Sequence, residues 1–215
     1  MQNNYSIGRT TNGLPIMACD FGLKGKPILL LAGVHGDEIE GVSLAKTLIA
    51  DFIKSFNYNV QLTVIAEFNL DGILLETRKN ANAVDLNRNL PTTDWTSKEE
   101  KEKYFPGTSP CSEVENKNLV QFITEKKIEF IISLHSWKPC LNINGNCKKE
   151  ATILSQITDY KIVEDIGYPT PGCLGTYAGL ERDIPTITYE LPRLEKNRRK
   201  VEDKNILAIK KVLSL

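Results

Sequence analysis

Short apolar runs alternate with amphipathic segments along this chain, and this alternation constrains the fold more than any other feature. The segments LPIMACDF, KPILLLAG, VQLTVIAEF, IEFIISLH and IPTITYELP are typical of strands. Between the second and third of them, apolar residues recur at steps of three and four from Glu38 to about Phe56, which predicts a helix lying on a sheet. The pattern therefore predicts an α/β fold with a mixed, mostly parallel central sheet flanked by helices.

Size and composition are those of an ordinary globular protein. The 215 residues suffice for one substantial core, so we expect residues 1–215 to form a single domain. Lys+Arg and Asp+Glu each number 27, and this balance gives no reason to expect a nucleic acid or a membrane as partner. No secretory signal or apolar run of about 20 residues is visible. The five scattered cysteines favour reduced thiols, so we expect a cytoplasmic protein of undetermined oligomeric state.

A long polar stretch divides the apolar pattern. From Asn69 to about Pro110 the chain has few apolar anchors, and a loop of this length inside a compact domain is usually functional or disordered. A helix is then expected over SEVENKNLVQFITEKK, where Ser112 and Glu115 fit a capping box. A second amphipathic helix is expected from about Lys196 to Leu215.

The chain has two histidines, and both follow an apolar run. His35 lies in VHGDE, three residues before Glu38, so the two side chains can converge at the first turn of a helix. His135 lies in SLHSW at the end of another expected strand. Two histidines and one carboxylate would leave a fourth zinc position open, as in catalytic sites. The alternatives are a chance HxxE and a half-buried histidine bonded to the backbone.

The stretch TRKNANAVDLNRNLP adds two arginines, Arg78 and Arg88, and the neighbouring Asn87. The planar guanidinium group matches a carboxylate in a bidentate manner and remains charged at any working pH. One arginine could stabilise the negative charge that develops on a carbonyl, and the other could bind a substrate carboxylate. By itself, this stretch is equally compatible with a solvated loop carrying surface ion pairs.

Taken in order, HGDE, NLDG, TRKNANAVDLNRN, SLHSW, TPGCLGTYAG and IPTITYELP resemble the zinc carboxypeptidase superfamily of the pancreatic type. More narrowly, the chain resembles the small bacterial murein peptide amidase A group, from about Leu29 to Pro192. The resemblance implies a zinc carboxypeptidase-like catalytic domain and a Zn²⁺ cofactor. It implies that His35, Glu38 and His135 are the zinc ligands.

The same resemblance implies roles for the remaining site residues. Glu190, in YELP, matches the general base and proton shuttle, although a strand-end glutamate more commonly faces solvent. Arg78 matches the arginine that polarises the scissile carbonyl, and Asn87 with Arg88 matches the pair that binds the terminal carboxylate. Tyr177, in GTYAG, lies near the position of a mobile substrate-binding tyrosine in larger relatives.

Two departures from the family pattern concern loop shape. The usual Asn-Pro-Asp-Gly is Asn69-Leu70-Asp71-Gly72 here, without the proline that stiffens a turn. The usual glycine before Val-Asp-Leu-Asn-Arg is Ala83, so we expect no positive φ at that position.

The substrate implied by the amidase group is a small peptide. The expected reaction is hydrolysis of the γ-D-glutamyl–meso-diaminopimelate amide of murein tripeptide during peptidoglycan recycling. The charged residues of GLERDIP, Glu181 to Asp183, are candidates for binding the diaminopimelate side chain, but a solvated turn is the more common role. The alternatives are another carboxypeptidase, a zinc N-acyl amino acid deacylase of the aspartoacylase or succinylglutamate desuccinylase type, and a binding module without turnover.

Overall fold

The computed structural model describes residues 2–98, 101–193 and 198–215. The five strands and three helices expected from the sequence are present, together with further strands and helices that were not expected. The strands are β1 (Gln2–Arg9), β2 (Pro15–Phe21), β3 (Lys26–Ala32), β4 (Val60–Ile65), β5 (Phe130–Trp137), β6 (Cys140–Asn144), β7 (Lys161–Val163) and β8 (Thr186–Pro192). The helices are α1 (Ile39–Lys54), α2 (Leu70–Leu74), α3 (Val114–Glu125), α4 (Lys148–Thr158) and α5 (Arg198–Val212). Short helical turns are η1 (Leu86–Arg88), η2 (Glu102–Tyr104) and the π-helical η3 (Gly175–Leu180).

The strands of the described part of the chain form one sheet in the order β1-β2-β4-β3-β5-β8-β6-β7. The four central strands, β4, β3, β5 and β8, are mutually parallel, whereas β1 with β2, β2 with β4 and β6 with β8 pair in antiparallel manner, and β7 is parallel to β6. The expected mixed, mostly parallel sheet flanked by helices is therefore confirmed at its centre. Parallel strands bring their carboxyl ends to one edge, where α/β folds place their sites.

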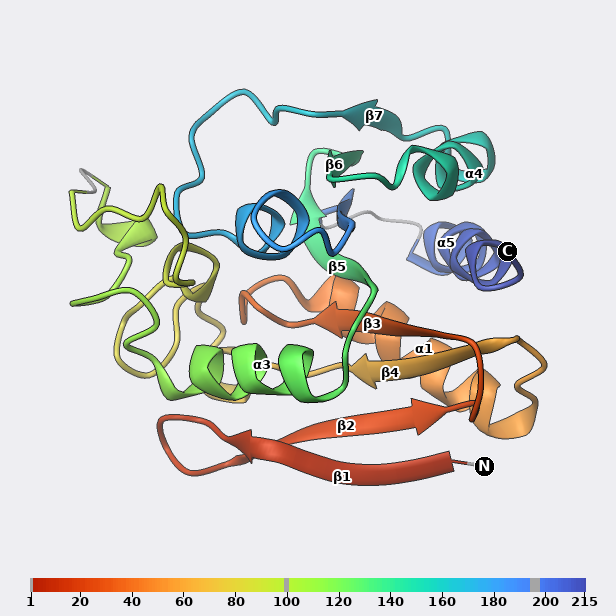
Figure 1. Ribbon diagram of the computed structural model, residues 1–215, viewed down its shortest axis with the longest axis horizontal. Coiled ribbons are helices and arrows are strands. Elements are labelled where there is room, and N and C mark those ends of the chain that lie inside the picture. Colours follow the sequence, from red (N-terminus) through yellow and green to blue (C-terminus); the bar gives the residue numbers. More distant parts are fainter. Residues whose placement is uncertain (1, 99–100, 194–197) are drawn as a thin grey trace.

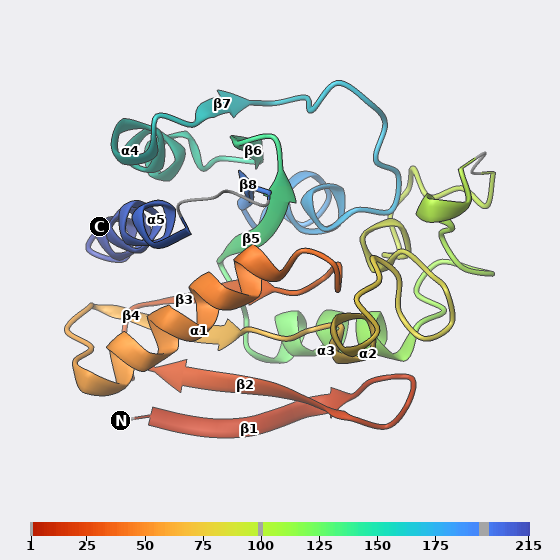
Figure 2. The ribbon, with the colours of Figure 1, turned by 180° about the vertical axis from the view of Figure 1, so that it is seen from behind.

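Both faces of the sheet are covered, as Figures 1 and 2 show from opposite sides. On β3, Ile28 and Leu30 pack with the core under α1, α4 and α5, whereas Leu29 and Leu31 pack with the core under α3 and η3. Successive side chains of a strand point to opposite faces, so a strand buried on both sides becomes an uninterrupted apolar run. This packing on both faces explains why the β3 segment KPILLLA contains an uninterrupted apolar run.

The expected start of α3 is wrong in detail. The helix begins at Val114 after Glu113, and no side chain caps it. Ser112 Oγ instead donates to the Glu113 carboxylate, and Asn89 Oδ1 accepts the Glu113 N–H. Glu115 is buried and accepts the Thr11 N–H at 2.8 Å. The acidic residue of the expected capping box therefore fastens the β1–β2 turn to α3.

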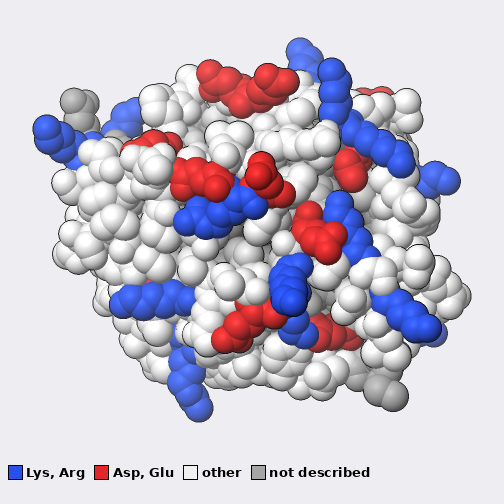
Figure 3. Space-filling view, in the orientation of Figure 1, with Lys and Arg blue, Asp and Glu red and all other residues white. Residues whose placement is uncertain are grey.

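The surface shows no dominant charge. Lysine, arginine, aspartate and glutamate are interspersed over the face drawn in Figure 3. Among the described residues, no helix combines the length and the apolar character needed to cross a bilayer. The C-terminal helix that we expected from about Lys196 is observed as α5, although Lys196 itself lies outside the described residues.

Candidate active site

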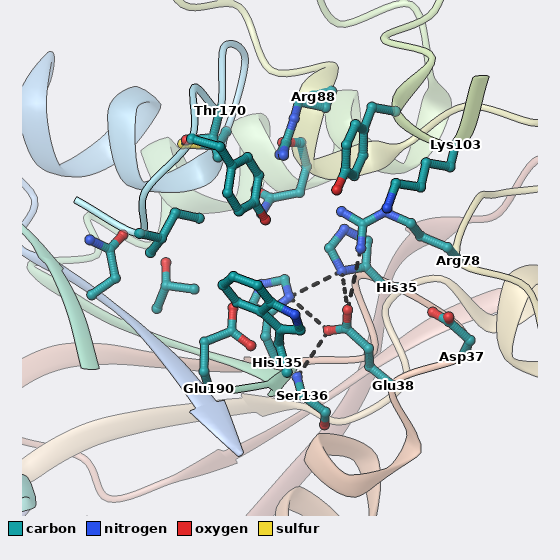
Figure 4. Close-up of a pocket in the computed structure, with 18 of the residues that line it drawn as sticks. His35, Asp37, Glu38, Arg78, Arg88, Lys103, His135, Ser136, Thr170 and Glu190 are labelled. Atoms are coloured by element: carbon teal, nitrogen blue, oxygen red, sulfur yellow. Dashed lines mark hydrogen bonds and ion pairs between the residues drawn. The ribbon is translucent and has the colours of Figure 1, made fainter. Parts of the chain in front are cut away.

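Three buried side chains converge at the carboxyl edge of the sheet. His35 and Glu38 lie in the turn after β3, and His135 lies near the end of β5 (Figure 4). His35 Nδ1 is 2.9 Å from Glu38 Oε1, and His135 Nδ1 is 3.0 Å from Glu38 Oε2. The two Nδ1 atoms are 3.2 Å apart. The structure thus brings together the three residues expected to hold a metal, although His135 lies far from His35 and Glu38 in sequence.

The hydrogen bonds around the rings favour a cation between these atoms. His35 Nε2 lies 3.1 Å from the buried Asp85 carboxylate. A carboxylate only accepts, so the proton of a neutral His35 belongs on Nε2, and the Nδ1 lone pair faces Glu38 and His135. Two imidazole nitrogens and a carboxylate oxygen form a donor set that suits Zn²⁺, and a carboxylate behind a histidine is the usual support for such a ligand. The residues present therefore fit a zinc ion.

Electrostatics keep the carboxylate of this cluster ionised. Burial works against the charged form of Glu38, but the imidazoles of His35 and His135 outweigh it and hold the pKa of Glu38 well below its usual value. Burial lowers the pKa of His135. Both effects favour the protonation states that a metal ligand requires, a carboxylate and a neutral imidazole. The pKa of His35 is raised instead, because burial and Arg78 are outweighed by the Glu38 and Asp85 carboxylates, so a metal ion would have to displace its proton.

Arg78 reaches this cluster from the polar stretch between α2 and η1. Its Nε and Nη2 lie 2.9 Å from Asp85 Oδ2, and its Nη1 lies 3.4 Å from Glu38 Oε1. Asp85 therefore orients both His35 and Arg78. Burial opposes its ionisation, but His35, Arg78 and Arg88 together lower the pKa of Asp85 far below its usual value. Asp85 was not among the site residues expected from the sequence. The one sign of its burial in the sequence is its place between apolar Val84 and Leu86.

Glu190 lies on β8, directly opposite His135 in the parallel ladder with β5. Its side chain borders the same cleft, and its Oε2 has no hydrogen-bond partner among the described residues. Burial, followed by the nearby Glu38 carboxylate, raises the pKa of Glu190 to about 8. A carboxyl group that changes charge near neutral pH is suited to accepting and returning a proton.

Asn87 and Arg88 enter the cleft from η1. Asn87 Oδ1 accepts the Leu174 N–H at 2.9 Å, which ties η1 to the chain before η3. Arg88 is buried, and its Nη1 donates to the Asn87 carbonyl at 2.7 Å. In the described part of the protein, Arg88 Nε has no hydrogen-bond partner and no carboxylate forms an ion pair with this guanidinium group. A buried unpaired cation in a cleft is a ready site for an anionic ligand.

Except for Asp85, these groups line one cavity of about 430 Å³, a size suited to a small peptide. The comparisons with known proteins agree with this arrangement. A family model described as zinc carboxypeptidase matches residues 2–195. This chain belongs to the zinc carboxypeptidase family. It is a metallopeptidase or amidase, and the family implies a zinc cofactor.

Among the relatives of this zinc carboxypeptidase are two bacterial amidases. It is 33% identical over 205 residues to murein peptide amidase A of Vibrio campbellii, covering 87% of this chain and 78% of the relative. It is 31% identical over 176 residues to murein peptide amidase A of Escherichia coli K12, covering 76% and 70%. These identities confirm the resemblance to the murein peptide amidase A group.

Solved structures share the fold. The crystal structure of a murein-tripeptide amidase from Escherichia coli O157 superposes with a TM-score of 0.83 at 25% identity, covering 99% of this chain and 92% of the other. Carboxypeptidase A from Helicoverpa armigera gives a TM-score of 0.84 at 17% identity, covering 99% of this chain and 68% of the other. The second likeness concerns the fold alone.

In the structure of this chain, Tyr177 lies away from the cleft. This position argues against the substrate-binding role expected for it. Tyr177 is buried in the core beneath η3, and the Arg182 guanidinium lies 3.7 Å from the centre of its ring. Tyr168 borders the cleft instead, stacked on Tyr104 with ring centres 6.2 Å apart. The ring of Trp137 lies 5.8 Å from that of Tyr168. An aromatic row of three rings therefore bounds the cleft.

The charged turn from Glu181 to Asp183 also lies apart from the residues that line the cleft. The Glu181 carboxylate accepts hydrogen bonds from the Thr93 N–H and hydroxyl, both at 2.7 Å. Arg182 donates to the Tyr177 carbonyl at 2.7 Å. These residues therefore support the loops around the site and do not line the substrate cavity.

Proposed function

We propose that this enzyme hydrolyses the amide bond before a carboxy-terminal residue, and that its substrate is the γ-D-glutamyl–meso-diaminopimelate bond of murein tripeptide. The observation that carries the first part is the buried, unpaired guanidinium of Arg88 in the same cleft as the His35–Glu38–His135 cluster and Glu190. A free substrate carboxylate would neutralise Arg88 and place the preceding amide near the cluster. The relatives named murein peptide amidase A support the second part.

His35, Glu38 and His135 would hold the zinc ion in this proposal. When bound, zinc lowers the pKa of water to about 7 and polarises a carbonyl oxygen. Glu190 would accept a proton from the attacking water at its unpartnered oxygen and pass it to the leaving nitrogen. Arg78 would stabilise the negative charge that develops on the carbonyl oxygen. Asn87 and Arg88 would bind the terminal carboxylate.

Part of the cleft lining suits a polar substrate side chain. Asn142 of β6, Thr188 of β8 and Thr170 line the cleft, and each offers a hydrogen-bonding group without a charge; Asn142 and Thr188 are register partners on neighbouring strands. The distal amine and carboxylate of diaminopimelate can form hydrogen bonds with several such groups. An apolar substrate side chain would leave these polar groups of the cleft without partners. This lining supports the proposed leaving group. Peptidoglycan recycling in the cytoplasm is the corresponding cellular role.

Mass spectrometry of L-Ala-γ-D-Glu-meso-diaminopimelate after incubation with the zinc-loaded enzyme tests the proposal. We expect free diaminopimelate and L-Ala-D-Glu, and no product when a chelator is present. Acetyl-aspartate and succinyl-glutamate serve as parallel substrates. Release of acetate or succinate without cleavage of the tripeptide would replace the proposal with the N-acyl amino acid deacylase alternative.

A further inference from the structure

Basic side chains of the cleft differ in whether a carboxylate already compensates their charge. The basic residues that line it are Arg78, Arg88, Lys101, Lys103 and Arg193. Arg78 forms ion pairs with Asp85 and Glu38, and Arg193 forms one with Asp37. Within the described ranges, neither Arg88 nor Lys103 has a carboxylate at ion-pair distance. Lys101 is not without a partner. The proposed terminal carboxylate accounts for Arg88, so Lys103 is left without an assigned anion.

The turn η2 holds Lys103 at the cleft. On one side of it, Glu102 is fastened to Lys79, whose Nζ lies 3.3 Å from the Glu102 carbonyl oxygen and 3.6 Å from Oε1. On the other side, the ring of Tyr104 lies 5.2 Å from the Arg78 guanidinium and 5.1 Å from that of Arg88. Both neighbours of Lys103 are therefore anchored to the segment that carries the two arginines, while Lys103 itself is exposed and its Nζ lies 4.6 Å from the centre of the Tyr104 ring.

The position of Lys103 relative to the other groups indicates which part of a substrate it meets. Figure 4 shows Lys103 and Arg78 on the opposite side of Arg88 from Thr170. In the proposed function, the residue after the scissile bond would lie on the side of Thr170, with its carboxylate on Arg88. The acyl part of the substrate must then leave past Arg78, toward Lys103.

We propose that Lys103 is a specificity-determining residue that binds a second carboxylate on the acyl side of the scissile bond. The inference rests on the proposed function, because a γ-linked glutamyl group carries a free α-carboxylate on a short aliphatic arm next to the scissile carbonyl. An α-linked acyl residue such as alanine carries none there. Arg193 is a weaker candidate for this carboxylate because Asp37 already pairs with it.

The test uses two peptides that differ in one group. One is L-Ala-γ-D-Glu-meso-diaminopimelate, and the other has the D-Glu α-carboxylate replaced by a carboxamide. For Lys103→Gln we expect a KM about five-fold higher with the carboxylate peptide, as for a solvent-exposed ion pair. The KM for the carboxamide peptide and both kcat values should remain unchanged, since the contact does not alter during the reaction.

Two further variants and a change of salt make the test specific. Lys103→Arg should restore the low KM, and Lys24→Gln, on the turn between β2 and β3 at the other edge of the sheet, should have no effect. The wild-type preference for the carboxylate peptide should shrink as ionic strength rises. Equal effects of Lys103→Gln on the KM values of both peptides would overturn this inference but not the proposed function. The same holds if the wild type shows no preference for the carboxylate peptide. Failure of the wild type to cleave either peptide would overturn the proposed function as well.

Discussion

Replacing Glu190 with glutamine keeps the shape of this side chain but removes its ability to carry a proton. Because Glu190 is not among the three metal-binding candidates, Glu190→Gln should retain zinc and lose a factor of about 10²–10⁴ in kcat. Metal analysis and steady-state kinetics on the same preparation measure both. Near wild-type turnover in a zinc-loaded Glu190→Gln sample would show that the proposed base is wrong.

The raised pKa of Glu190 also predicts the pH dependence of the reaction. The base acts as a carboxylate, so activity should fall as pH decreases through the pKa of Glu190. This pKa is about 8 for the protein without a metal ion, because burial and Glu38 disfavour the charge. A bound cation favours the carboxylate and moves the acidic limb of kcat/KM below that value. A profile that stays flat down to about pH 4, near the ordinary glutamate value, would contradict this prediction.

Arg88→Ala should mainly weaken substrate binding. Loss of hydrogen bonds to a charged group typically costs about 1.5–3 kcal/mol, so KM for a peptide with a free terminal carboxylate should rise roughly 10- to 100-fold. A matched peptide with a terminal carboxamide should already bind weakly and change little. Arg182→Ala, which removes an arginine outside the cleft, is the control. An unchanged KM in Arg88→Ala would exclude it as the carboxylate-binding group.

Single residues were predictable from the sequence where their motif belongs to the family. His35, Glu38, Arg78, Arg88 and Glu190 were expected to share one site, and the structure brings their side chains to one cleft. Tyr177 was a reasonable candidate by spacing, but spacing does not reveal which tyrosine of an irregular segment faces a cavity. Asp85 was not predictable, because a carboxylate that orients other groups has no motif separable from its neighbours.

At the scale of elements, the turn after β3 depends on close backbone contact with α2. A Cβ on Gly36 would lie 2.0 Å from the Gly72 carbonyl carbon, so Gly36→Ala must displace one of the two segments. We expect a loss of about 1–3 kcal/mol in unfolding free energy and weaker zinc binding, because His35 is the preceding residue. Denaturant unfolding and zinc titration measure these effects.

Gly13→Ala is the control for the glycine substitution. Gly13 has positive φ but open space around its Cα, so its replacement introduces backbone strain without a collision. It should leave zinc affinity unchanged. If Gly36→Ala binds zinc as tightly as the wild type, contact with α2 does not position the metal ligands.

Most elements with strong apolar periodicity were predicted, but the amphipathic helix α4 (Lys148–Thr158) was not, and the polar or very short strands were also missed. β1 (QNNYSIGR) is an edge strand with little apolar character, and β7 has three residues, so neither produces a pattern. The expectation of no positive φ at Ala83 was wrong, since its φ is 59°. Asn80 stabilises this turn, because its Oδ1 accepts the N–H groups of Asn82 at 3.1 Å and Val84 at 3.0 Å. These local hydrogen bonds offset a backbone conformation that alanine alone disfavours.

For the whole molecule, zinc should act as a stabilising ligand. A metal that binds only the folded state adds about 4 kcal/mol of stability at a concentration 1,000 times its Kd. Addition of zinc to the chelated protein should therefore raise Tm by several degrees, measured by differential scanning calorimetry. His35→Ala should lack this shift. An identical shift in His35→Ala would place the metal elsewhere.

The order of strands in the whole sheet did not follow from the sequence. Apolar runs indicate which segments are strands, but the position of β8 between β5 and β6 depends on long-range packing that no local pattern records. The family resemblance nevertheless indicated the fold class, because motifs from the whole chain matched in order. The sheet explains how motifs so distant in sequence form one site, since parallel strands bring their carboxyl ends to one edge.

His135 and Glu190 are register partners on adjacent strands, so the main-chain hydrogen bonds of the ladder hold the residues of the metal ligand and the base side by side. The groups proposed to select the substrate come largely from the segments 75–107 and 164–174, outside this ladder. Engineered changes within those segments that spare Arg78 and Asp85 should therefore alter selectivity while His135 and Glu190 keep their places in the ladder. This small enzyme is in that respect a suitable scaffold for directed evolution of new amidases.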